Sequence, residues 1–248
     1  MTRDSTENLS KQSHTRWYAE QLGWQLSRLT VVVEGTSDVS YFRLAGRLYQ
    51  KQHGRTLLNH NVTVVAAGHG ARGGTHTIME EFPVLRKILD MEKQCGIPQL
   101  VTLVTLLDDD DAGRKAREYI TRRNHNLSKY RDVFLLKRCM PLDTKNPKDL
   151  ELSTKNCNRP WEFLDCEIED LINREVVDCF VFENPGCLSR NIQEFNGAFH
   201  CDFTVAGKSK FCRFVNEFAR LEDLSGIISV LKAMRYYMGF EVDGDINS

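Results

Sequence analysis

The chain has 248 residues, of which 41% are hydrophobic and 27% are charged, a composition typical of a globular protein long enough to bury a full core. Its length favours one domain with an appendage, or two small domains. The net charge of −1 excludes an overall basic surface, so any nucleic-acid interface must be local. The longest apolar run, residues 100–107, is shorter than the roughly 20 residues that cross a bilayer, so we expect no membrane span.

The start of the chain and its cysteines indicate a cytoplasmic protein. Residues 1–16 are polar and lack the apolar segment of a secretory signal. The eight cysteines lie far apart, with no C-x-x-C pair and no cysteine–histidine spacing typical of zinc. We therefore expect reduced thiols.

Strands and helices alternate over the first part of the chain. Apolar, β-branched runs predict strands, and apolar residues at helical spacing predict the helices between them. The first helix is expected to carry an apolar stripe of Trp17, Leu22 and Leu26. This alternation favours an α/β fold with a mainly parallel sheet flanked by helices. The predicted strands are 29–33, 62–66, 100–107 and 132–137, and the predicted helices are 15–28, 38–51, 75–93 and 112–124.

The rest of the chain has a weaker pattern. Residues 140–160 are polar and turn-rich, which predicts a surface loop. We expect a helix over 161–173, a strand over 176–182, and helices over 208–221 and 224–238. The predicted domains are an N-terminal tail and helix (1–28), an α/β domain (29–173) and a mostly helical C-terminal extension (174–248).

Two acidic clusters directly follow predicted strands. EGTSD occupies residues 34–38, and DDDDAG occupies residues 108–113. The carboxyl ends of parallel strands meet at one edge of a sheet, so these carboxylates can converge on a crevice and hold a divalent cation. Taken singly, each cluster has an equally good structural explanation, because acids cap helices and complement the helix dipole. Their combination favours a metal site.

Together the clusters resemble the TOPRIM domain shared by topoisomerases, bacterial primases and nucleases of the OLD (overcoming lysogenization defect) family. VVVEGTSDV at residues 31–39 is similar to that family's strand followed by E-G-x-x-D-V. LLDDDDAGR at residues 106–114 is similar to its strand followed by D-x-D-x-A-G-R. The resemblance makes residues 29–173 a TOPRIM catalytic domain. It implies that the metal carboxylates are Glu34, Asp108 and Asp110.

The chemistry of these residues agrees with that implication. The resemblance makes Asp109 and Asp111 intervening positions rather than ligands, and acids at i and i+2 leaving a strand do lie on the same side. Oxygen ligands without histidine or cysteine favour Mg²⁺ or Mn²⁺ over zinc. Because carboxylates repel one another without a cation, we expect the metal to matter for local order.

The resemblance extends to a further acid and a lysine. OLD-like enzymes place an acid after the fourth strand, and our first choice is Glu169, with Glu167 close behind, for a second metal ion. Two cations about 4 Å apart would activate water and stabilise the leaving oxygen. The late lysine motif of these enzymes resembles GKSKF at residues 207–211, where Lys210 is the match and Lys208 fits nearly as well. An acidic helix face and a solvated lysine are the structural alternatives.

Basic residues near the acidic clusters are candidate phosphate contacts. The glycine-rich turn at 68–74 lacks the Walker A ending, so we expect it to form a flexible edge of the crevice, with Arg72 available to a phosphate. Arg114 and Lys115 start a basic helix that could follow a phosphate backbone. A solvated helix face explains that helix equally well.

The length and the missing zinc spacing separate this chain from topoisomerases and primases. The resemblance therefore implies a compact, Mg²⁺-dependent OLD-like nuclease that cleaves nucleic-acid phosphodiester bonds, with DNA and RNA both open as substrates. OLD proteins usually join the nuclease to an ABC-type ATPase, yet no Walker A lysine motif occurs here. We expect a separate ATPase chain, as in split prokaryotic anti-phage defence systems.

The sequence is also consistent with other functions. One is an endonuclease of RNA maturation, which differs only in its substrate. Another is a non-catalytic binding or regulatory module that keeps the acids for Mg²⁺-dependent folding or partner docking. The aromatic residues of the C-terminal helices could form a homodimer surface, although core packing explains them better.

Overall fold

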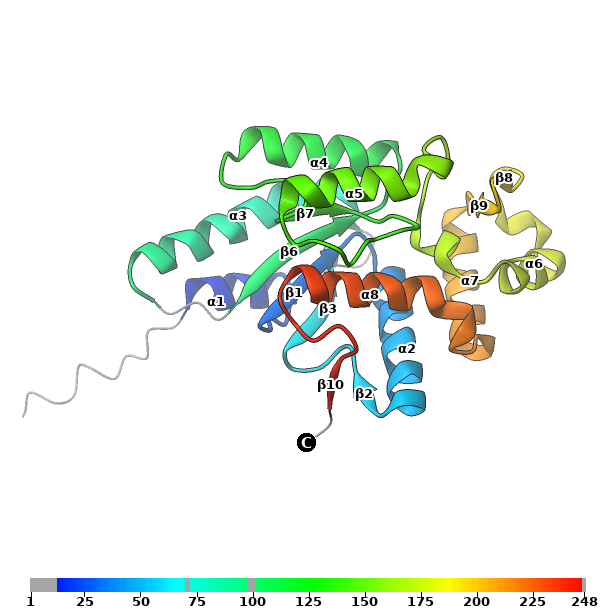
Figure 1. The fold of residues 1–248 in the computed structure, drawn as a ribbon, viewed down its shortest axis with the longest axis horizontal. Coiled ribbons are helices and arrows are strands. Elements are labelled where there is room, and N and C mark those ends of the chain that lie inside the picture. The colour runs from blue at the N-terminus through cyan, green and yellow to red at the C-terminus, as the bar shows by residue number, and fades with distance from the viewer. Residues whose placement is uncertain (1–12, 70–71, 98–100, 247–248) are drawn as a thin grey trace, which may run out of the picture.

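The computed structural model shows a four-stranded, all-parallel sheet flanked by helices (Figure 1). It describes residues 13–69, 72–97 and 101–246. The predicted α/β fold with a mainly parallel sheet is confirmed. In spatial order the strands are β3 (Val62–Ala66), β1 (Leu29–Val33), β6 (Thr102–Leu107) and β7 (Val133–Leu135).

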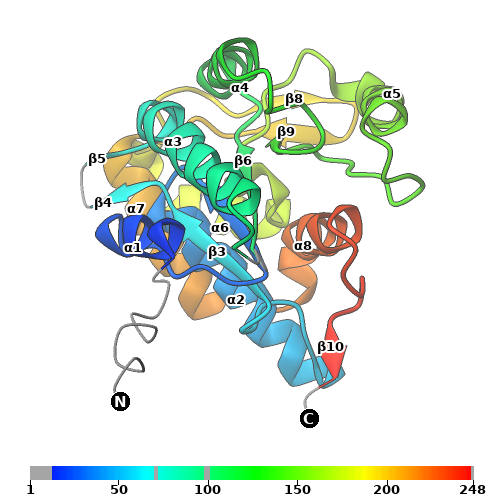
Figure 2. The same ribbon diagram turned by 90° about the vertical axis from the view of Figure 1, so that its left-hand side faces the viewer.

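Helices cover both faces of this sheet (Figure 2). One face carries α1 (His14–Gln21), α3 (Thr75–Gln94) and α4 (Asp111–Arg123). The other carries α2 (Thr36–His53), α7 (Val205–Phe218) and α8 (Ser225–Tyr237). The remaining elements are α5 (Pro147–Asn158), α6 (Arg174–Glu183) and three short antiparallel pairs, β2 (Arg55–Thr56) with β10 (Asp245–Ile246), β4 (Gly68–His69) with β5 (Arg72–Gly73), and β8 (Gln193–Phe195) with β9 (Ala198–His200).

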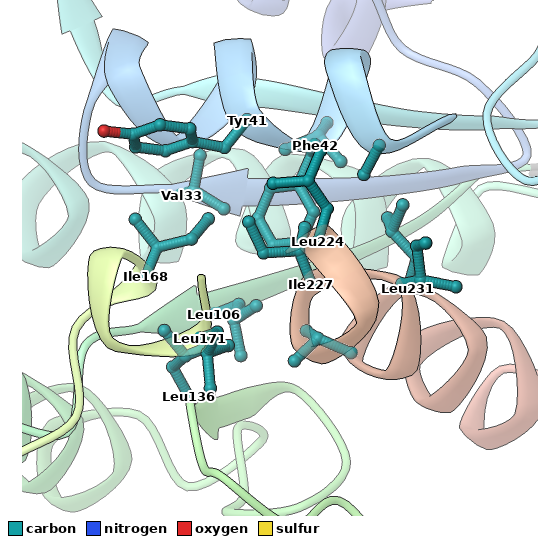
Figure 3. Close-up of a cluster of buried hydrophobic side chains, with 14 of the residues drawn as sticks. Val33, Tyr41, Phe42, Leu106, Leu136, Ile168, Leu171, Leu224, Ile227 and Leu231 are labelled. Carbon is teal, nitrogen blue, oxygen red and sulfur yellow. The ribbon is translucent and has the colours of Figure 1, made fainter. Parts of the chain in front are cut away.

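The alternation of side chains along the strands explains the two helical layers. Val32 and Leu107 pack with α3 and α4, whereas Val31 and Leu106 face the layer of α2 and α8. Figure 3 shows the second layer, where Ile227 of α8 lies among side chains from the sheet, α2 and residues 168–171. The C-terminal extension therefore completes the same hydrophobic core as the sheet.

The strand order reverses between β1 and β6. From β1 the chain moves outward through α2 to β3, and α3 then returns it to β6 on the other side of β1. In open α/β sheets, ligands bind at such a switch point, outside the carboxyl ends of the strands. Val32 lies opposite Thr105 in the register, so Glu34 and Asp108 leave the sheet side by side.

Two predicted elements after β7 are wrong. Residues 161–173 do not form the predicted α-helix but contain the 3₁₀ turn Ile168–Leu171 and follow another, Arg159–Trp161. The predicted strand over 176–182 is the helix α6. Asn173 caps this helix by accepting a hydrogen bond from the Glu175 amide at 3.1 Å, and its buried residues, Val177 and Phe180, have helical spacing.

Other boundaries also differ. The predicted loop 140–160 contains α5, since Asn146 caps a helix with Pro147 in its first turn. The first helix ends at Gln21 rather than 28, and Trp17 is 52% exposed. Trp24 beyond the helix is buried instead, and its Nε1 donates to the Ala66 carbonyl at 2.8 Å.

The bounds of β7 and α7 differ slightly from the predicted ones. The strand predicted over 132–137 is limited to β7, and α7 begins three residues before the predicted position 208. The predicted strand start at Leu100 lies outside the described residues. All eight cysteines are free. Within the described ranges, no helix has the length and apolar character needed to cross a membrane.

Candidate active site

The ends of β1 and β6 are joined by a hydrogen bond. Glu34 Oε1 accepts from the backbone amide of Asp108 at 3.0 Å. The Asp108 carboxylate in turn lies within the electrostatic field of Glu34, Glu167 and Glu169. The structure thus brings residues from three separate segments to the switch point of the sheet.

The four aspartates after β6 alternate in direction. Asp110 Oδ1 caps α4 by accepting from the Gly113 amide at 2.6 Å, and its charge acts on Glu34. Asp109 forms ion pairs with Lys137 and, at 3.4 Å, with Arg114. Asp108 and Asp110 therefore face the acids, while Asp109 is engaged elsewhere.

Glycine at position 113 lets this loop approach α4. A Cβ atom there would lie 2.0 Å from the Asp108 carbonyl oxygen, which no side chain tolerates. The fourth aspartate, Asp111, is exposed and pairs with Lys115 at 2.5 Å. The close approach fixes Asp108 and Asp110 relative to the start of the helix.

Asp38 belongs to the same site, although the sequence analysis assigned it no role. Its Oδ2 accepts from the Gly35 amide at 2.9 Å at the start of α2, and its charge acts on Glu34, Asp108 and Glu169. It is the aspartate of the E-G-x-x-D-V pattern, so the pattern itself could have identified it. We call the set of Glu34, Asp38, Asp108, Asp110, Glu167 and Glu169 the acid cluster.

The 3₁₀ turn Ile168–Leu171 presents the last two acids. Glu169 is 1% exposed, and Glu167 precedes the turn. Asp170 holds the turn in place, since it accepts from the Glu167 and Cys201 amides at 2.8 Å each and contacts His200 Nδ1 at 2.7 Å. Both candidate acids of this segment therefore lie in the acid cluster.

Of the two candidate lysines, the structure places Lys208 in the acid cluster. Its Nζ lies 2.7 Å from Glu167 Oε2, whereas Lys210 is exposed. Lys208 precedes the buried Phe211 and Val215 by three and seven residues, so all three share the inner face of α7. The helical phase of these apolar residues was the signal that could have favoured Lys208 over our first choice.

Burial and mutual repulsion shift the titration of the acid cluster. Burial raises the pKa of Glu34 to about 7, with further contributions from Asp38 and Asp110. It raises the pKa of Asp38 to about 6 and of Glu169 to about 8, and that of Asp108 well above its ordinary value. Protonation is therefore one way in which the cluster lowers its repulsion at neutral pH.

Lys208 is the counter-charge to these acids. Burial alone would lower its pKa, but the charges of Glu169 and Glu167 outweigh this effect and raise the pKa above the ordinary value. Lys208 consequently stays protonated. One ammonium against six carboxylates leaves an excess of negative charge on the site.

The donor set of the acid cluster fits a hard divalent cation. Among the described residues, no three acidic, histidine or cysteine side chains stand in an arrangement ready to bind a metal ion. The carboxylate oxygens are nevertheless the ligand type of Mg²⁺ and Mn²⁺, and burial, together with repulsion from neighbouring acids, raises the pKa values of Glu34 and Glu169. A cation would replace the protons of Glu34 and Glu169.

The other candidate phosphate contacts lie in different places. Arg114 is turned toward the loop, where it donates to the Asp109 carbonyl at 2.8 Å and pairs with Asp165 at 2.9 Å. Lys115 pairs with Asp111 on the exposed side of α4. Arg72 lies in β5, and its side chain falls outside the described part of the structure.

Comparisons with known proteins add no relative. A scan against protein-family models and searches of curated proteins and of solved structures found no match to this chain.

Proposed function

We propose that this protein is a Mg²⁺-dependent TOPRIM nuclease, closest to the OLD-like enzymes, that hydrolyses phosphodiester bonds of nucleic acids. The observation that supports this proposal most directly is the acid cluster itself. Six carboxylates and a half-buried lysine meet at the switch point of a parallel sheet, where such folds bind their ligands. The chain's E-G-x-x-D-V and D-x-D-x-A-G-R patterns supply four of the six acids.

The residues have distinct roles in the proposed reaction. Glu34, Asp108 and Asp110 would hold one cation, and Glu169 with Glu167 and Asp38 would hold a second. Bound Mg²⁺ or Mn²⁺ would supply an activated water and neutralise charge on the phosphate. Without a cation, the buried Glu169 holds a proton at neutral pH, because its pKa is about 8.

Lys208 would act on the phosphate directly. Its ammonium is held by Glu167 within the acid cluster, and its raised pKa keeps it charged. A fixed positive charge facing the phosphoryl oxygens stabilises the charge that develops in the transition state. Positioned donors of this kind contribute about 10² to 10³ in rate.

A cleavage assay tests the proposal. Purified protein is incubated with plasmid DNA and with structured RNA, in Mg²⁺, Mn²⁺ or EDTA. We expect metal-dependent cleavage that is lost in Glu34→Gln and Asp108→Asn and retained in the matched control Asp111→Asn, whose carboxylate is exposed and paired with Lys115. Equal cleavage by all three variants would assign the activity to another site or to a contaminant.

We further propose that the nuclease acts in the cytoplasm with a separate ABC-type ATPase chain, as an effector of prokaryotic anti-phage defence. The resemblance to OLD proteins, whose nuclease usually works with an ABC-type ATPase, supports a partner that supplies ATP hydrolysis. Co-purification from the native host tests this pairing. Recovery of an active homodimer with no ATPase, together with no ATPase gene nearby, would contradict it.

A further inference from the structure

A polar cavity lies between α4 and α5. Its volume is about 240 Å³, and it is lined by residues of α4, α5 and the segments on either side of β7, among them Arg117, Lys137, Lys155 and Trp161. This volume is below the usual range of about 300–1,000 Å³ for drug-sized ligands. A phosphate group fits inside it, and a larger ligand would extend past its rim. We call it the α4–α5 cavity.

Hydrogen-bond donors on the wall of this cavity lack acceptors. Arg117 Nε and Nη1 and Arg138 Nε are buried and have no hydrogen-bond partner. The guanidinium of Arg117 is held over the ring of Tyr130, with its Cζ 5.8 Å from the ring centroid. An unmatched buried donor destabilises the folded state, more so when it is charged, so the fold maintains these groups at a cost in stability.

Arginines of this chain that serve structure use most of their donors. Arg86 Nε is also buried without a partner, but its Nη1 and Nη2 donate to Leu103 O at 3.4 Å and to Asp132 Oδ1 at 2.8 Å. Arg235 is fully buried, and each of its three nitrogens donates, to Glu241 O, Leu57 O and Asp245 Oδ1 at 2.6–2.9 Å. Arg117 differs because two of its nitrogens are unmatched and its side chain lines the α4–α5 cavity. That difference indicates a ligand rather than a packing role.

The remaining charges of the cavity leave room for an anion. Asp109 is neutralised by Lys137 and Arg114. Glu151 and Glu162 are exposed, as is Lys155, which adds a positive charge from α5. Arg117 and Lys155 together fit a phosphate group, since guanidinium and ammonium groups are the usual phosphate donors.

An aromatic side chain completes the cavity. Trp161 lines it, and its Nε1 donates to the Asn196 carbonyl at 3.1 Å, which fixes the ring. Fixed aromatic rings stack on nucleobases and strengthen their binding. Glu151 and Glu162 offer acceptors for sugar hydroxyls.

We propose that the α4–α5 cavity binds a nucleoside 5′-monophosphate group, with the phosphate on Arg117 and Lys155 and the base against Trp161. The group could come from a free nucleotide or from the 5′-phosphorylated end of a nucleic acid. Both share the chemistry that the cavity recognises. This site is separate from the acid cluster and does not rest on the proposed nuclease activity.

Calorimetric titrations of the full chain in EDTA test the proposal. The probes are AMP, inorganic phosphate, and a dinucleotide with and without a 5′-phosphate. We expect AMP to bind and Arg117→Met to weaken its binding at least tenfold. Arg122→Met is the matched control, because Arg122 lies on the same helix and pairs only loosely, at 3.6 Å, with Glu118. It should change the affinity less than twofold.

The outcomes are decisive. Tighter binding of the 5′-phosphorylated dinucleotide than of AMP supports an end-binding site, and the reverse supports a free nucleotide. Failure of every probe to bind the wild-type protein overturns the proposal, as does unchanged binding by Arg117→Met. Inorganic phosphate binding as tightly as AMP overturns the nucleoside part. If Arg117→Met does not fold, Lys155→Ala, at an exposed position, tests the proposal instead. We expect it to weaken AMP binding at least threefold.

A metal-free titration also keeps this test independent of the cleavage assay. Without a metal ion the acid cluster carries excess negative charge and repels phosphate, so binding there does not imitate binding in the α4–α5 cavity. Glu34→Gln, which is expected to abolish cleavage, should bind AMP like the wild type.

Discussion

Glu169 and Asp170 are neighbours in the chain and both are buried, yet their surroundings are opposite. Asp170 accepts hydrogen bonds from two backbone amides and contacts His200, while Arg138 lies 3.7 Å away. Glu169 faces Asp38 and Glu167, with Lys208 as the opposing charge. One carboxylate is satisfied by the fold, and the other is left in need of a cation.

Two adjacent acids of this chain therefore have different roles, one structural and one functional. A buried charge with its hydrogen bonds made stabilises the turn that carries it. A buried charge without them is retained only when something outside the chain supplies the missing partner. On this reasoning Asp170 positions the turn, and Glu169 serves the proposed chemistry.

The largest effect on stability should come from replacing Asp170, the carboxylate whose hydrogen bonds the fold provides. Asp170→Asn replaces an acceptor oxygen with a donor among buried donors, so we expect a loss of about 3–5 kcal/mol. For a chain of this size, that loss lowers the Tm by at least about 6 °C. Thermal unfolding followed by circular dichroism measures it. A decrease below 2 °C would remove Asp170 from its positioning role.

The next effect concerns Lys208, the positively charged side chain next to the carboxylates of the acid cluster. Lys208→Met should reduce metal-dependent cleavage by about 10² or more, because the charge facing the phosphate is lost. The matched control is Lys210→Met, which removes an exposed lysine two residues away and should stay within twofold of the wild type. Initial rates on the preferred substrate measure both. A larger effect at position 210 would reverse our assignment of the lysine.

A smaller effect of opposite sign is expected at Glu169. Glu169→Gln removes one of the repelling carboxylates, so the metal-free protein at pH 8 should gain about 1–2 kcal/mol in stability. The increase in Tm on adding Mg²⁺ should shrink in the same variant. Differential scanning fluorimetry measures both, with the exposed Glu183→Gln as the control. A destabilised variant with an unchanged Mg²⁺ response would contradict the assignment.

The same raised pKa values predict a pH dependence of the stability of the metal-free protein. The pKa values of Glu34, Asp38 and Glu169 are raised to about 7, 6 and 8, so between about pH 4.5 and 8 the folded state binds more protons than the unfolded state. Their contribution to stability is present below about pH 4.5 and is lost as the pH rises to 8. The Tm difference between wild type and Glu169→Gln, followed over this range, isolates the effect of Glu169. A constant difference would contradict it.

Much of this fold was predictable because its buried strands are short and β-branched. The predicted strands 29–33 and 62–66 match β1 and β3 residue for residue. Prediction failed over residues 176–182, where valine and phenylalanine favour a strand locally but the Asn173 cap and the burial of Val177 and Phe180 select a helix. The secondary structure of that segment therefore depends on its tertiary contacts.

The site was predictable where each acid directly follows a strand. Glu34 and Asp108 needed only the parallel order of two neighbouring strands to meet. Lys208 was harder to choose, because its position depends on the phase of α7 against the core. The α4–α5 cavity could not be predicted, since α5 was taken for a loop and the cavity depends on its packing.

The alternation of the aspartates after β6 has a consequence for how this segment can vary in evolution. Asp108 and Asp110 serve the acid cluster, and Asp109 serves Lys137 on the wall of the α4–α5 cavity. Adding or removing a single residue would exchange these directions and spoil both sites at once. Homologous sequences should therefore tolerate many residue types at exposed position 111, but no insertion or deletion between β6 and α4.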